Sequence, residues 1–102
     1  RLALLDVPKR LVLLAIARRI RKKAYIMMGE AEEAYKVVCE EYGEKRRAHT
    51  QFWKYVGDLD ALGLIDTKLS GEGVVGKTTL ISLPEIPSKM LSDNLERSLK
   101  RR

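Results

Sequence analysis

The sequence has few residues of several kinds, and each shortage excludes a class of protein. Its one cysteine, Cys39, leaves no disulfide to form within the chain, which indicates an intracellular protein. Cys39 falls on an apolar helix face with no evident base partner, the one histidine being His49, so we interpret it as a buried thiol. No apolar run approaches the about 20 residues of a membrane span, and no long apolar stretch leads to a small-residue cleavage site, so we expect no signal peptide. Gln51 and Asn94 are the only amide side chains, a shortage typical of thermophilic proteins.

Charge is plentiful by contrast, and it is unevenly distributed. The 102 residues suffice for one domain with a single core, and the net charge is +6. Residues 1–23 hold eight basic side chains against Asp6 alone, residues 30–44 hold six Glu against Lys36, and residues 45–54 are basic again. A polyanion should therefore meet some faces and be repelled by another. Charge alone leaves open the alternative that these are ordinary solvated faces.

Hydrophobic spacing predicts four helices and three short strands. We expect helices at 8–22, 30–42, 50–62 and 88–101, a short strand at 25–28 that Gly29 ends, and strands at 64–69 and 77–83. Apolar stripes at helical spacing mark the last three helices: Ala31, Ala34, Tyr35, Val38, Cys39 and Tyr42; Phe52, Tyr55, Val56, Leu59 and Leu62; Met90, Leu91, Leu95 and Leu99. These faces are the expected core.

The order of these elements predicts a winged helix. The second and third helices, joined by a tight link at 43–48, form a helix-turn-helix, and the glycine-containing hairpin behind them is the wing. Gly43 and Gly63 suit helix ends, and His49 or Thr50 suits the N-cap of the third helix. The fold class is therefore α+β and mostly helical, a winged helix-turn-helix with a C-terminal β-hairpin wing and a trailing helix. We expect residues 1–86 to form the DNA-binding domain and residues 87–102 an amphipathic helix, packed on it or frayed.

One motif indicates nucleotide binding rather than a winged helix. The stretch from Gly71 to Thr78 matches the phosphate-binding pattern G-x-x-x-x-G-K-[ST]. That chemistry needs a helix to begin at the Lys-Thr pair, so that backbone N–H groups converge on phosphate. The β-branched residues and Pro84 that follow favour a strand instead. We interpret the glycines as turn residues and the match as a coincidence.

Several polar residues are placed to contact DNA. On the third helix the face opposite the apolar stripe carries Thr50, Gln51, Lys54, Gly57 and Ala61, where small residues permit close approach and Gln51 and Lys54 can reach bases or phosphates. Arg46 and Arg47 before this helix, and Lys9 and Arg10 at the start of the first, are candidates for phosphate. Residues 18–23 could serve DNA or form a solvated helix end, and Trp53 is expected to pack on the wing or on another domain.

The sequence resembles the C-terminal winged-helix domain of archaeal origin-recognition initiators. The resemblance rests on the run at 7–19, the helix with Tyr35, Cys39 and Tyr42, the turn at 59–65 and the wing sequence at 76–78. It implies that the third helix enters the major groove and the wing contacts the minor groove, through Thr50, Gln51, Lys54, Gly73, Gly76, Lys77 and Thr78. The hairpin tip departs from the family in carrying Glu72 and a lysine where arginine is usual. We therefore expect the third helix to make most of the contact.

The resemblance also implies partners. They are double-stranded DNA, the protein's own N-terminal AAA+ domain and other replication proteins, in the nucleoid-associated cytoplasm of an archaeal cell and without a membrane. ATP or ADP and Mg²⁺ belong to the AAA+ domain, so we expect no cofactor, metal or catalysis here. The alternatives are a winged helix that docks on the AAA+ domain or another replication factor, a transcription regulator and, last, a nucleotide-binding enzyme.

Overall fold

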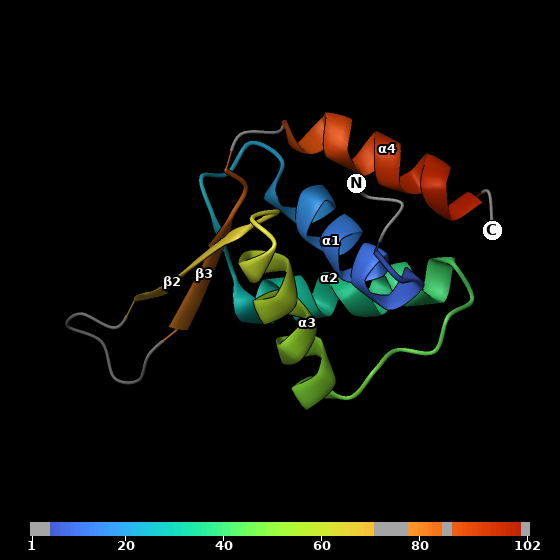
Figure 1. Cartoon of the computed structure of the whole chain (residues 1–102), viewed down its shortest axis with the longest axis horizontal. Coiled ribbons are helices and arrows are strands. Elements are labelled where there is room, and N and C mark those ends of the chain that lie inside the picture. The colour runs from blue at the N-terminus through green and yellow to red at the C-terminus, as the bar shows by residue number, and fades with distance from the viewer. Residues whose placement is uncertain (1–4, 71–77, 85–86, 101–102) are drawn as a thin grey trace.

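The computed structural model describes residues 5–70, 78–84 and 87–100, and its elements follow the predicted order. They are α1 (Val7–Ile20), β1 (Ile26–Met27), α2 (Met28–Glu41), α3 (His49–Ala61), β2 (Asp66–Ser70), β3 (Thr78–Ser82) and α4 (Ser88–Lys100) (Figure 1). Four helices with a small antiparallel sheet confirm the mostly helical winged-helix fold.

Helix α1 is the centre of the core. Every residue from Leu11 to Ala17 is buried, because α2, α3 and α4 all pack against this helix. A helix that is apolar on all sides belongs inside a protein. The side chain of Asp6 caps α1 by accepting a hydrogen bond from the N–H of Lys9 (3.2 Å).

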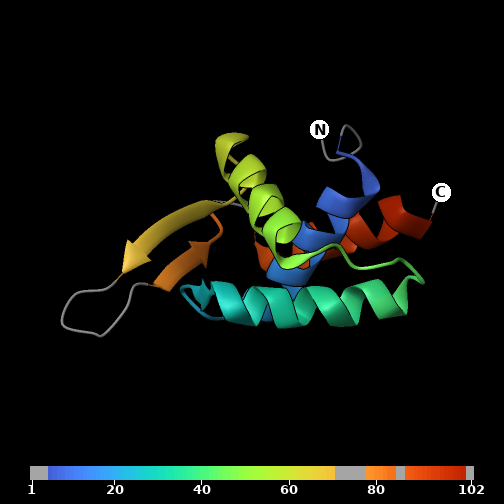
Figure 2. The same cartoon turned by 90° about the horizontal axis from the view of Figure 1, so that it is seen from below.

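The three strands pair in the order β1-β3-β2, all antiparallel. Ile81 of β3 lies opposite Ile26 on one side and Thr67 on the other, and both isoleucines are buried. Strands β1 and β3 contact α2, while β2 and β3 extend beyond the helices (Figure 2). The sheet therefore closes one end of the core and carries the wing outward.

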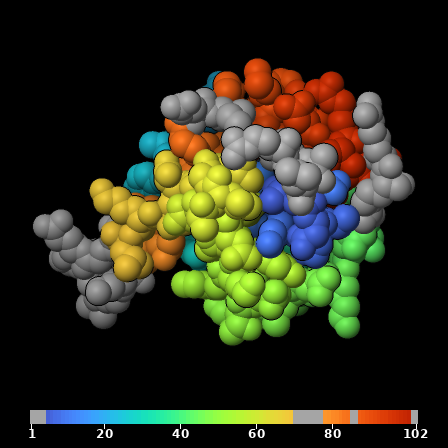
Figure 3. Space-filling model, viewed as in Figure 1, coloured from blue at the N-terminus to red at the C-terminus, as the bar shows by residue number. Residues whose placement is uncertain are grey.

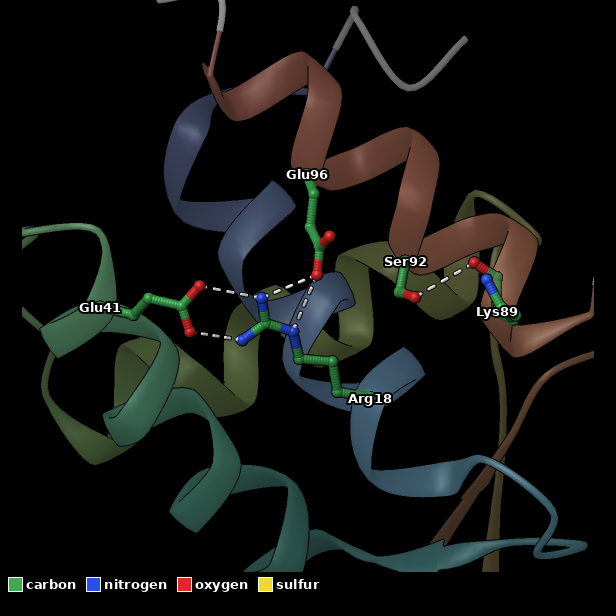
Figure 4. A network of polar contacts seen from close by, with 5 residues as sticks. All are labelled: Arg18, Glu41, Lys89, Ser92 and Glu96. Atoms are coloured by element: carbon green, nitrogen blue, oxygen red, sulfur yellow. Dashed lines mark hydrogen bonds and ion pairs between the residues drawn. The ribbon is translucent and has the colours of Figure 1, made fainter.

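Helix α4 lies against α1. Leu91, Leu95 and Leu99 are buried, as predicted, but Met90 is 57% exposed. Arg18 adds a polar tie between three helices, because its guanidinium donates to Glu41 (2.7 Å) on α2 and to Glu96 (2.8 Å) on α4 (Figure 4). The two alternatives predicted for residues 18–23 were DNA contact and a solvated helix end. Arg18 fits neither, because its side chain joins three helices.

Other local predictions were wrong in detail. Gly29 does not end the strand but lies in the first turn of α2, because the carboxylate of Glu30 accepts from the N–H of Met27 and starts the helix early. The N-cap of α3 is Ala48, without a side-chain hydrogen bond. The link between α2 and α3 spans residues 42–48 and is longer than a tight turn.

The helix ends follow the glycines. Gly43 and Gly63 have φ of 64° and 77°, the left-handed conformation predicted for residues that end a helix. The N–H of Glu44 reaches the carbonyl of Cys39, and the N–H of Leu64 reaches that of Leu59, which closes both helices in the same way. Leu62, predicted to be core, is 49% exposed at the end of α3, where the helical stripe no longer continues.

Candidate nucleic-acid interface

Helix α3 presents one side to the surface beside the start of α1 (Figure 3). Its other side is fixed in the core by Phe52, Tyr55, Val56 and Leu59, all buried. The outward side carries the exposed residues Thr50, Lys54, Gly57 and Ala61, while Gln51 is half-buried at its edge. The structure thus groups the residues predicted from the helical period, and it holds them on a rigid support.

An acidic side chain joins two of the predicted basic residues. The carboxylate of Asp58 on α3 lies 3.4 Å from Nζ of Lys9 on α1 and 3.6 Å from Nζ of Lys54. Lys9 and Lys54 are therefore neighbours on one surface, although they are far apart in the sequence. The spacing of Lys54 and Asp58 was visible in the sequence, whereas the approach of Lys9 depends on how α1 crosses α3.

Two basic residues precede the N-terminus of α3. Arg46 and Arg47 are exposed just before the helix, and the first turn contains no acidic residue. The N–H of Arg47 donates to the hydroxyl of Tyr35 (2.9 Å), which fixes the link to the core. Burial raises the pKa of Tyr35 to about 12, so this hydroxyl stays protonated in neutral solution.

Helix α3 makes three further contacts: one with α2, one within the helix and one with strand β2. Nδ1 of His49 donates to the carboxylate of Glu32 on α2 (2.8 Å), and the His49 ring lies 5.4 Å from the ring of Trp53. The hydroxyl of Thr67 on β2 donates to Asp60 on α3 (2.6 Å). Trp53 therefore has its neighbour on its own helix, and a short hydrogen bond joins the first wing strand to α3.

Arg10 lies apart from this group. Its guanidinium donates to the carbonyl of Leu5 (2.8 Å) and to the hydroxyl of Ser98 on α4 (3.1 Å). The side chain is directed toward α4, so the structure does not bring Arg10 to α3 as it brings Lys9. Sequence spacing gave no means of separating these two adjacent residues.

The wing tip lies outside the described residues. This applies to three of the residues implicated in the wing, Gly73, Gly76 and Lys77. Thr78 is described, and there the chain begins strand β3 with Ser70 as its partner. The strand that begins at Thr78 is not the helix that a phosphate-binding loop needs at this residue, and residues 71–77 of the motif lie outside the described residues.

Within residues 5–70, 78–84 and 87–100, no three His, Cys, Asp or Glu side chains come together as a metal site would require. In the same described residues, no helix is long and apolar enough to cross a membrane.

Comparison with known proteins gives consistent matches. Residues 3–93 match the family model described as CDC6, C terminal winged helix domain. The ORC1-type DNA replication protein 2 of Sulfurisphaera tokodaii is 41% identical over 93 residues, which are 89% of this chain and 22% of that protein. The chain thus spans about a fifth of this curated relative.

Two solved structures share the fold. The crystal structure of Cdc6p from Pyrobaculum aerophilum superposes with a TM-score of 0.85 at 38% identity, over 98% of this chain and 25% of that one. The Aeropyrum pernix ORC1 protein in complex with DNA gives a TM-score of 0.79 at 24% identity, again over 98% and 25%. At that lower identity the likeness establishes the fold alone.

Proposed function

Since the chain belongs to the CDC6 C-terminal winged helix family, we propose that it binds double-stranded DNA as one module of a replication initiator. The observation that carries this proposal is the outward side of α3, which has a rigid core on one side and Lys9 and Lys54 on its surface. A protein of the same fold, the Aeropyrum pernix ORC1 protein, has been solved with DNA. The proposal extends that mode of use to this chain.

In the proposed complex α3 lies in the major groove. Its N-terminal residues Thr50 and Gln51 face base edges, where short polar side chains can discriminate between base pairs. Lys9 and Lys54 neutralise phosphates beside the groove, and Arg46 and Arg47 meet phosphate near the helix N-terminus, where the helix dipole also favours an anion. The wing lies near the minor groove and adds fewer contacts than α3.

The role proposed for this chain is binding rather than catalysis. ATP or ADP with Mg²⁺ would be held by an AAA+ domain elsewhere in the protein, which is also the proposed partner within the same chain. Placing the nucleotide in another domain agrees with strand β3, which begins at Thr78, the last residue of the motif at 71–78. DNA-bound initiators of this kind would reside at the nucleoid.

A salt series tests the proposal. Duplex affinity, measured by fluorescence anisotropy between about 50 and 300 mM salt, should fall with a log–log slope of roughly −4 to −5, as for about 4–6 phosphate contacts. Lys54→Ala should weaken binding and make the slope less negative by about one. Lys89→Ala on α4 removes the same charge from a side chain whose printed partner is Asp93, and it should leave binding unchanged.

Flat and weak binding would contradict the proposal. It would favour the alternative of a winged helix that docks on its own AAA+ domain or another replication factor. An equal loss in Lys54→Ala and Lys89→Ala would show that net charge matters and the surface of α3 does not.

A further inference from the structure

Gly57 occupies the middle of α3 on its outward side, where glycine has no evident use within the protein. It follows Lys54 by three residues, is exposed, and lies inside a regular helix. A Cβ built at this position meets nothing within 4 Å, and its φ lies outside the left-handed range. Glycine weakens a helix relative to alanine, because it has more conformational freedom to lose on folding. In the part of the chain that the structure describes, no contact compensates for this cost.

Among the described glycines, only Gly29 is comparable. Gly43 and Gly63 have positive φ and end helices, so their conformation explains them. Gly29 has open space around it, but it lies in the first turn of α2, whereas Gly57 lies in the interior of α3. Among the described glycines, Gly57 is therefore the one that neither its conformation nor a contact with the described residues explains.

We infer that Gly57 is the point of closest approach between α3 and the base-pair edges of the major groove, and that it sets how deeply the helix lies. This inference rests on the function proposed above. Two observations carry it: the unoccupied space over Gly57, and its position one turn beyond Lys54 on the side flanked by the Lys9–Asp58–Lys54 group. The absent side chain lets the backbone of α3 come nearer to DNA than a side chain of any size would permit.

How deeply α3 enters the major groove decides whether it can discriminate between base pairs, because the side chains at its N-terminal end are short. Thr50 can reach a base edge only when the helix backbone is close. A methyl group at position 57 would displace the helix outward by on the order of 1 Å, enough to lengthen hydrogen bonds beyond about 3.2 Å, where they weaken. Lys9 and Lys54 have long flexible side chains and would keep their phosphates. Sequence discrimination should therefore be lost while salt dependence stays.

The experiment compares Gly57→Ala with Gly29→Ala. A duplex selected from a random pool by the wild-type chain and a scrambled duplex are each titrated in a salt series, and thermal melting is followed in parallel. Gly57→Ala should raise Tm by about 3–6 °C, because alanine favours the helix. It should weaken binding to the selected duplex by about tenfold or more and to the scrambled duplex by less than about threefold, with an unchanged salt slope. Gly29→Ala should bind both duplexes as the wild type does.

Four other results would contradict the inference about Gly57, and they differ in what they leave of the proposed DNA binding. If Gly57→Ala binds the selected duplex as tightly as the wild type, the close approach does not occur at Gly57. If the wild type binds both duplexes equally with clear salt dependence, DNA binding stands and the approach to base edges is wrong. If Gly57→Ala lowers Tm, glycine has a use within the fold and the premise fails. If the wild type shows no salt-dependent binding at all, the proposed function fails and takes this inference with it.

Discussion

Neutralising Asp58 should strengthen DNA binding, although the change removes two ion pairs from the protein. In the free chain Asp58 lies within 3.4 Å of Lys9 and 3.6 Å of Lys54, so its carboxylate competes with phosphate for both ammonium groups. It also places a negative charge on the proposed interface. Asp58→Asn keeps the shape of the side chain and removes both effects.

The size of the effect follows from the exposure of the three side chains. Lys9 is 26%, Asp58 34% and Lys54 66% exposed, so both pairs are surface pairs, each contributing about 0.2–1 kcal/mol. Releasing both lysines to phosphate should therefore add about 0.4–2 kcal/mol to binding, or about two- to thirtyfold in affinity. Repulsion between a carboxylate and a phosphate about 8 Å away contributes up to about 0.5 kcal/mol more before salt screening.

The assay needs a control for net charge. Asp93→Asn removes a carboxylate on α4 that pairs with Lys89 (3.2 Å) at the same i,i+4 spacing as Asp58 with Lys54. Both variants gain one positive charge, so the difference in their duplex affinities isolates the position of Asp58. We expect Asp58→Asn to bind more tightly than Asp93→Asn at about 100 mM salt, with a gap that narrows as salt rises. Equal affinities would refute the placement of Asp58 at the interface.

Three further predictions concern the fold. Arg18→Met should lower the free energy of unfolding in urea by about 1–2 kcal/mol, because it removes the cation that joins Glu41 to Glu96. An unchanged free energy of unfolding would mean that these three side chains interact mainly with water. Arg18 lowers the pKa of the Glu41 carboxyl below 4.5, and the N–H of Met27, followed by Lys23, lowers the pKa of the Glu30 carboxyl in the same way. The stability that these two carboxylates contribute is therefore present above pH 4.5 and is lost as pH falls through the lowered pKa values. Tm measured from pH 7 to 3 should fall in that acid range, and the fall should be smaller in Arg18→Met. Leu95→Ala should cost about 2–5 kcal/mol and the exposed Met90→Ala less than about 0.5; similar losses would indicate that α4 is frayed.

The sequence sufficed for the order of the elements but not for the arrangement around α1. Periodicity marks one apolar face on α2, α3 and α4, and each face is buried largely as predicted. No stripe was marked on the first helix, and in α1 Leu11 to Ala17 are all buried, because α2, α3 and α4 pack around it. Residues 11–17 are apolar at every position, which is itself a signal for burial on all sides, but the sequence of one helix does not say which helices cover each side.

For the candidate site, too, the sequence predicts which residues share a side of one helix but not which residues of different helices meet. Thr50, Lys54 and Gly57 share a side of α3 because the helical period puts them there, and the sequence sufficed to group them. The approach of Lys9 to Asp58, and the diversion of Arg10 to Ser98, depend on the crossing of α1 with α3 and α4. The helical period separates Lys9 and Arg10 by about 100° around α1, but it does not say which of the two faces α3.

The motif at 71–78 shows why a pattern needs its structural context. Its glycines, lysine and threonine match a phosphate-binding loop in spacing, but a loop of that kind works through the backbone of the helix that follows. Here Thr78 begins strand β3 and pairs with Ser70 of β2. The β-branched residues after Lys77 were the decisive signal, and they were present in the sequence.

The two proposals for α3 make a joint prediction, because Gly57 and Asp58 are adjacent and both act through the distance between helix and DNA. If Gly57→Ala lifts α3 outward, Asp58 moves away from phosphate, and its removal should then gain less. Lys9 and Lys54 keep their phosphates in Gly57→Ala, so only the part of the Asp58→Asn gain that comes from repulsion should shrink in that background, by up to about 0.5 kcal/mol or about twofold, a coupling of the kind seen between neighbouring residues. The four affinities of this double-mutant cycle, measured on the selected duplex at one salt concentration, give the coupling directly. Strict additivity would mean that Gly57→Ala weakens binding without moving the helix, and the depth argument would then be wrong.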